Sequence, residues 1–161
     1  MLAADVCYRL GGKAEALARN GTDSEAVRFY KAASVMVPFN VRYAKRAAGA
    51  IGIGAVANGP DAWSLTVEAL DIAARLRSWR PLDPEAYLLE SRVLALAAGV
   101  SMRLEFADAS LAAIESAQKL APNFLLAALS AGRIAGINSD AEAKGLADLE
   151  FKRIAGLEGK R

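Results

Sequence analysis

Residues 10–38 read LGGKAEALARNGTDSEAVRFYKAASVMVP, and this stretch decides the fold. After its central turn, Ala26, Tyr30 and Ala33 recur at the spacing of one helix face, and Pro38 then stops the helix. Similar spacing precedes the turn at Leu10, Ala14, Leu17 and Gly21. Two helices packed against each other are therefore expected here. Looser copies of the pattern follow twice, which predicts an α-helical repeat architecture.

The composition favours one helical domain. The chain has 161 residues, enough for a proper core and short for two ordinary domains. Ala, Leu and Val carry most of the apolar content and aromatic residues are few, as in helices packed at close range. We therefore expect a single all-α domain over residues 1–161, built from antiparallel helical hairpins with about eight helices in total.

Several kinds of chemistry are excluded by the residues that are missing. Cys7 is the only cysteine and histidine is absent, so disulfide frameworks, His-based metal sites and Ser-His or Cys-His catalysis within this chain are ruled out. No cofactor is expected. An enzyme would have to use Glu85 and Glu90 with Tyr87, but Glu85 is more simply a first-turn helix acid and Glu90 a surface charge. We therefore do not expect an enzyme.

The charge is nearly balanced overall and uneven along the chain. The formal net charge is +2, yet residues 28–80 hold eight basic and three acidic residues. A basic binding face is one interpretation of this excess, and an ordinary solvated helix surface is the other. Nucleic-acid binding is not expected, because, Trp79 apart, the basic residues show no regular interleaving with aromatic residues, and the overall basicity is low.

Capping residues, glycines and prolines along the sequence indicate where the helices begin and end. They are expected over residues 3–19, 22–37, 41–58, 62–77, 84–100, 106–120, 124–135 and 139–157. Thr22 and Ser139 each begin a capping box with Glu three residues later. Asp83 is expected to be an N-cap with Pro84 at the first helical position. Residues 78–82, between the fourth and fifth helices, are expected to form a loop.

Glycines and aromatic residues suggest where helices pack. Gly49, Gly52 and Gly54 lie inside an expected helix, and each costs roughly 1 kcal/mol relative to Ala, so tight packing is expected to compensate. Trp63, Trp79 and Tyr87 could face a ligand or close a core, and we favour the core. The first helix is expected to bury an apolar stripe of Ala4, Cys7, Tyr8, Leu10, Ala14 and Leu17.

The pattern of Leu10, Ala14, Leu17, Gly21, Ala26, Tyr30, Ala33 and Pro38 resembles a tetratricopeptide repeat, a helix-turn-helix unit of about 34 residues. The resemblance implies repeats over about residues 3–38, 41–81 and 84–122, followed by capping helices over residues 124–157. It also implies a tetratricopeptide-like α-solenoid whose concave face is lined by the first helix of each pair. The second and third copies are longer than the family's unit, which puts a regular superhelix in doubt.

A narrower resemblance concerns residues 2–5, 37–43 and 82–87. These segments look like the soluble repeat region that follows the last membrane helix of bacterial O-antigen ligases and polysaccharide polymerases. The resemblance implies an extracytoplasmic module, with glycosyl transfer carried out by a membrane part outside this chain. The chain is then periplasmic, whereas a complete chain without a visible signal peptide is expected in the cytoplasm.

These observations lead to a protein-interaction module as the expected function. Arg42, Lys45 and Arg92 are expected on the concave face, where their shared charge implies an acidic protein or peptide partner. No membrane span is expected, because the longest apolar stretch, residues 47–57, is about half the ~20 residues a span needs. The same stretch is the alternative surface for docking or dimer formation, so formation of an oligomer is possible.

Overall fold

The computed structural model describes residues 2–17, 24–57 and 59–122, and the elements within these ranges are all helical. The α-helices are α1 (Leu2–Leu17), α2 (Ser24–Met36), α3 (Val41–Ala57), α4 (Ala62–Trp79), α5 (Pro84–Ser101) and α6 (Leu104–Leu120). A short 3-10 helix, η1 (Gly59–Asp61), precedes α4. The all-α prediction is thereby confirmed for the described ranges. Within them, no helix is long and apolar enough to cross a membrane.

Part of the predicted organisation lies outside the described residues. This applies to the helices expected over residues 124–157 and to the capping boxes that begin at Thr22 and Ser139. The predicted count of eight helices includes that part. The chain divides into two compact units, Met1–Pro81 and Leu82–Arg161. The division falls between the second and third predicted repeats.

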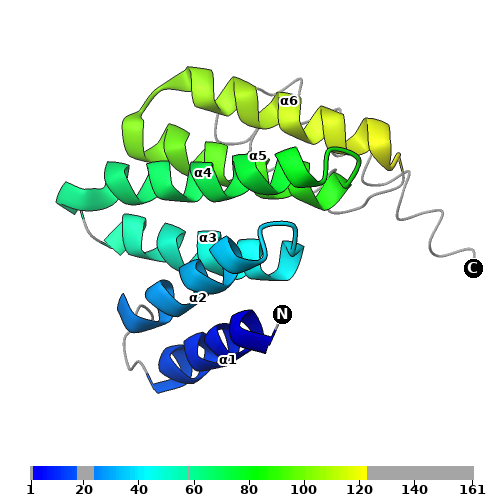
Figure 1. Cartoon of the computed structure of the whole chain (residues 1–161). Coiled ribbons are helices and arrows are strands. Elements are labelled where there is room, and N and C mark those ends of the chain that lie inside the picture. The colour runs from blue at the N-terminus through cyan, green and yellow to red at the C-terminus, as the bar shows by residue number, and fades with distance from the viewer. Residues whose placement is uncertain (1, 18–23, 58, 123–161) are drawn as a thin grey trace, which may run out of the picture. The chain divides into compact units, whose positions relative to one another are not determined.

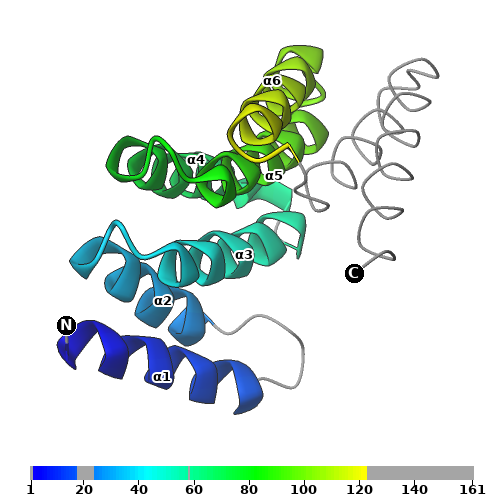
Figure 2. The same cartoon turned by 90° about the vertical axis from the view of Figure 1, so that its right-hand side faces the viewer.

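In the first unit, consecutive helices pack on one another in chain order. α1 packs on α2, α2 on α3 and α3 on α4, and the first three run in alternating directions side by side (Figures 1 and 2). Most of the core is alanine, with Ile51, Ile72 and Leu76 as its largest aliphatic members. Ala33 is fully buried, as predicted for the small position near the α1–α2 contact. Small side chains allow the helix axes to approach closely.

The buried face of α1 differs from the predicted apolar stripe. Ala4, Gly11 and Ala14 are buried, whereas Leu10 and Leu17 are exposed. The reason is the close approach of the Tyr30 ring from α2. A Cβ atom added at Gly11 would lie 2.8 Å from two carbons of that ring. A residue larger than glycine does not fit there without movement, and Leu10 and Leu17 lie off this buried face.

Two predicted helix boundaries were wrong, and the structure gives the reason. α4 continues through Trp79, where a loop was expected, because its first strong stop signal is Pro81, which disfavours helix at Arg80. α6 starts at Leu104, two residues earlier than expected, because α5 ends abruptly at Met102. That residue has a positive φ of 56°, a left-handed cap that no glycine marked in the sequence.

The prediction of close packing at the α3 glycines has different outcomes at Gly54 and at Gly49. A Cβ added at Gly54 would lie 3.6 Å from a Leu65 methyl group, an ordinary contact. At Gly49, nothing lies within 4 Å of the added atom. Gly49 therefore weakens the helix without any compensating contact inside the described part of the chain.

Replacing Gly49 with Ala should raise the free energy of unfolding by up to about 1 kcal/mol, because the helix gains propensity and no neighbour is displaced. Urea titration followed by circular dichroism measures the change. Gly11→Ala is the matched comparison and should destabilise, because its new methyl group meets the Tyr30 ring. A stability loss at Gly49 would contradict the open environment described here.

In the second unit, α5 and α6 pack against each other around Leu88, Ile114 and Ala117. A buried polar contact joins the same two helices. The Ser110 hydroxyl donates to the Ser91 carbonyl oxygen at 2.8 Å, and the two hydroxyls lie 3.0 Å apart. Because the pair satisfies its own hydrogen bonds, these small residues bring the helices close without leaving an unpaired polar group.

Asp83 caps α5 as predicted. Its carboxylate accepts a hydrogen bond from the Glu85 backbone N–H at 2.9 Å, and Pro84 occupies the first turn. Replacing Asp83 with Ala should cost about 1 kcal/mol of stability, because one backbone donor loses its partner. Thermal unfolding measures the loss. Asp108→Ala, an exposed change within α6, is the control and should have a much smaller effect.

Candidate functional site

Three tyrosines from three different helices meet in the first unit. The ring of Tyr8 on α1 lies 5.6 Å from that of Tyr30 on α2 and 5.1 Å from that of Tyr43 on α3, measured between centroids. Both contacts are tilted, an arrangement that aromatic pairs favour. Tyr30 and Tyr43 are buried and Tyr8 is half-buried. The rings therefore connect the core of this unit to its surface.

Carboxylates of α1 bind the hydroxyl groups of the two buried tyrosines. Tyr30 donates to Glu15 at 2.6 Å, and Tyr43 donates to Asp5. Burial, followed by the Glu15 hydrogen bond, raises the pKa of Tyr30 to about 12. The hydrogen bond to Asp5, followed by burial, raises the pKa of Tyr43. Both hydroxyls therefore serve as donors that fix α1 against α2 and α3.

Arg42, in the first turn of α3, is held by Tyr8 of α1. Its Nε donates to the Tyr8 hydroxyl at 3.0 Å, and its Cζ lies 4.8 Å from the centroid of the Tyr8 ring. The side chain is exposed, and no carboxylate of the described residues pairs with it. Because the contact with the Tyr8 hydroxyl uses Nε, the two terminal nitrogens of this exposed guanidinium stay available as donors.

Arg46 lies one turn further along α3 and is engaged differently. Its Nη1 is 3.4 Å from a Glu15 carboxylate oxygen, a loose ion pair between exposed side chains. The Tyr8 hydroxyl and then the Glu15 carboxylate raise the pKa of Arg46 above its usual value. We call the exposed face formed by Tyr8, Glu15, Arg42 and Arg46 the α1–α3 surface.

The three predicted partner-binding residues are placed differently from one another. Arg42 lies on the α1–α3 surface. Lys45 is on α3 as expected, but it is half-buried and already engaged in other interactions. Arg92 is exposed on α5 of the second unit and is no part of the surface described here. Of the three, Arg42 is the residue that the structure associates with a defined arrangement of neighbours.

Sequence reasoning missed the α1 contribution to this surface. Tyr8 was assigned to an apolar stripe, and Glu15 was not singled out. A signal was present, because Asp5, Tyr8, Gly12 and Glu15 recur at spacings of three and four residues and so share one face of α1. Polar groups at these positions indicate a face that meets other polar groups, here those of α3.

The other predicted sites have a simpler structural explanation or none. Glu85 lies in the first turn of α5, where a helix acid is expected. Trp79 is 62 % exposed, against the expectation that it closes a core, and contacts the Phe39 ring edge-on. Among the described residues, no group of three or more His, Cys, Asp or Glu side chains is arranged to hold a metal ion.

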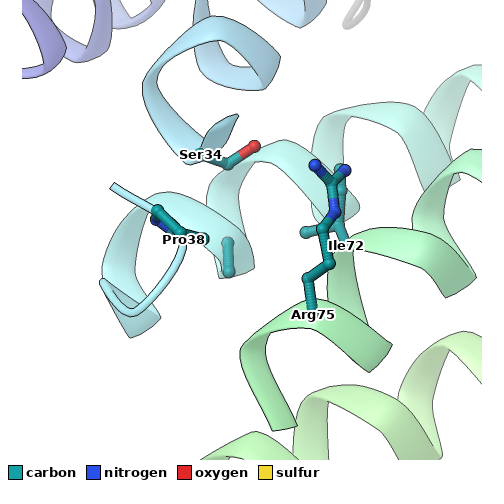
Figure 3. A pocket seen from close by; sticks show the side chains of 5 residues that line it. Ser34, Pro38, Ile72 and Arg75 are labelled. Carbon is teal, nitrogen blue, oxygen red and sulfur yellow. The ribbon is translucent and has the colours of Figure 1, made fainter. Parts of the chain in front are cut away.

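A crevice lies between α2, α3 and α4. It is lined by Ser34, Pro38, Ala44, Ile72 and Arg75 (Figure 3). Its interior has no space that would admit a water molecule, and Arg75 at its edge is paired with Asp71 at 2.7 Å. The crevice is therefore a packing defect rather than a small-molecule site.

No protein-family model matches this chain, and neither does any curated protein. The resemblances to tetratricopeptide repeats and to polysaccharide ligases therefore stay predictions. The α1–α3 surface is therefore the basis for the function proposed for this chain.

Proposed function

We propose that this chain is a protein-interaction module, without catalytic activity of its own, that binds an acidic segment of a partner on the α1–α3 surface. The proposal takes the hairpins as tetratricopeptide-like repeats, whose first helices line one binding face. Side chains of α1 and α3 do meet, in the Tyr8–Tyr43 ring contact and the Arg46–Glu15 ion pair, as such a shared face requires.

The main support for this proposal is that Arg42 is oriented by Tyr8 and is not paired with a carboxylate of the described residues. Its guanidinium rests on the Tyr8 ring and is oriented by the Tyr8 hydroxyl, so little side-chain freedom is left to lose on binding. The planar fork of an arginine matches a carboxylate with two parallel hydrogen bonds. Since no carboxylate of the described residues occupies that position, an acidic partner is the group that fits it.

The test measures binding of a glutamate-rich synthetic peptide by fluorescence anisotropy at low salt. Arg42→Gln should raise Kd about fivefold, because an exposed charged contact contributes on the order of 1 kcal/mol. Arg28→Gln, an exposed arginine on α2, is the matched control and should leave Kd unchanged. Circular dichroism should show equal helicity for both variants.

Two outcomes would count against the proposal. Equal peptide affinity for the native chain and Arg42→Gln removes Arg42 from the site. Salt-insensitive binding also contradicts it, because contacts between exposed charges weaken as ionic strength rises. Retention of an RNA oligonucleotide that depends on Arg42, in place of the peptide, would favour the nucleic-acid interpretation instead.

A further inference from the structure

The exposed face of α3 continues beyond Arg42 in a straight line. Gly49 and Ile53 follow Arg42 by seven and eleven residues, close to two and three turns of an α-helix at 3.6 residues per turn. The three residues therefore point to the same side of α3. Ile53 is 52 % exposed, and Val56, less than one turn later, is 75 % exposed. A cation at one end of this line is thus followed by an apolar end.

Gly49 leaves the middle of the line flat. Nothing lies within 4 Å of a Cβ built at this position, so its lack of a side chain brings no packing gain within the described part of the chain. Glycine inside a helix nevertheless costs about 1 kcal/mol relative to Ala. At an exposed position, the missing side chain lets another backbone approach the helix closely.

The charge distribution along α3 favours one orientation of a segment bound on the line from Arg42 to Ile53. Arg42 is in the first turn of α3, whose free N–H ends make that end of the helix partly positive. The Asn40 side chain accepts the Arg42 and Tyr43 N–H groups at 3.0 and 3.3 Å and so fixes this end. The last turn of α3 carries no basic residue. Negative charge is therefore favoured at the Arg42 end and apolar groups at the Ile53 end.

From this arrangement we infer that α3 binds an extended segment of a partner protein in which a carboxylate and an apolar side chain are about four or six residues apart. Eleven residues of helix rise about 16 Å. An extended chain covers that distance in about five residues at about 3.3 Å each, and because its side chains alternate between two faces, the neighbouring even spacings of about four and six are the ones that turn both side chains toward α3. The carboxylate meets Arg42, the backbone crosses Gly49 and the apolar side chain contacts Ile53. This inference rests on the proposed function and specifies its partner.

The experiment titrates the full ¹⁵N-labelled chain with synthetic peptides that differ only in the spacing between one Glu and one Leu. The peptides with spacings of about four and six should bind at least about fivefold more tightly than the peptide with a spacing of five and than peptides with still shorter or longer spacings. Their binding should shift the NMR signals of Arg42, Gly49 and Ile53 together. A blocked C-terminus keeps the Glu side chain distinct from a terminal carboxylate, and a peptide that ends in a free carboxylate at either of these spacings tests that second source.

Glycine variants separate binding from folding. Gly49→Leu should stabilise α3 yet lower affinity at least about tenfold, because its side chain blocks the approach of the peptide backbone. Gly99→Leu is the matched control, since Gly99 of α5 is an equally open helical glycine, and it should not change affinity. Ile53→Ser should abolish the dependence of affinity on the Glu–Leu spacing of the peptide, while weak binding through Arg42 persists.

Each remaining outcome overturns a defined part of the inference. Arg42-dependent binding that ignores spacing, or that survives Gly49→Leu, overturns the extended segment and leaves the proposed function standing. A peptide that binds best with its two groups eleven residues apart and becomes helical also overturns the extended segment. If no peptide shifts the Arg42 signals, the inference and the proposed function both fail.

Discussion

Replacing Ala33 with Trp should lower the free energy of unfolding by about 3 kcal/mol or more. Ala33 on α2 is 0 % exposed. It shares one core cluster with Ala4 of α1, with Val37, which follows α2, and with Tyr43 of α3. A tryptophan side chain cannot leave this cluster without breaking the helix, so it has to push α1 or α3 away. Urea unfolding followed by circular dichroism measures the loss.

The control for this prediction is an equally large residue on an exposed site. Ala16 is an exposed alanine on α1, and Ala16→Trp should change stability only slightly. Ala33→Ser tests the same position without added bulk and should be far milder than Ala33→Trp. A melting temperature for Ala33→Trp equal to that of the native chain would show that the register of α1 and α2 is wrong.

Local signals explain why most helices could be predicted. Pro38 and Pro81 stop α2 and α4, and Asp83 with Pro84 starts α5, because each acts through the backbone of its own or the adjacent residues. No neighbour from elsewhere in the chain is needed for such effects. Met102 is the exception, since its left-handed conformation carries no composition signal and the start of α6 was misplaced as a result.

Contacts between helices could not be predicted in the same way. Leu10 is more apolar than Gly11, so periodicity assigned it to the core, yet the Tyr30 ring, nineteen residues after Gly11, decides which of the two is buried. Arg42 was identified from its place on a helix face. Its orientation depends on Tyr8, thirty-four residues earlier on another helix. The spacing of residues within one helix does not reveal such a contact.

Raising the pH from 10 to 12 should destabilise the native chain by about 2 kcal/mol relative to Tyr30→Phe. The Tyr30 hydroxyl has its ordinary pKa of 10.0 in the unfolded chain and a pKa of about 12 in the fold. A raised pKa means that the fold prefers the neutral, protonated hydroxyl. Its contribution is therefore complete below pH 10 and is lost as the pH rises through 12.

Measuring the difference between two chains isolates Tyr30 from every other group. Every other group, including Tyr43 with its raised pKa, is present in both chains and cancels in the comparison. Urea unfolding at a series of pH values should give a native curve that falls more steeply above pH 10 than the Tyr30→Phe curve. Parallel curves would mean that the fold does not distinguish the two forms of this hydroxyl.

Glu15→Gln decides which cause of the raised pKa dominates. Burial is the largest cause, because Tyr30 is 2 % exposed, and the hydrogen bond and charge of Glu15 come after it. The amide oxygen of Gln can still accept the hydrogen bond but carries no charge. The Glu15→Gln curve should therefore keep most of the fall above pH 10 and lie closer to the native curve than to that of Tyr30→Phe. A Glu15→Gln curve that coincides with Tyr30→Phe would mean that the Glu15 charge, rather than the packed ring environment between α1, α2 and α3, controls this tyrosine.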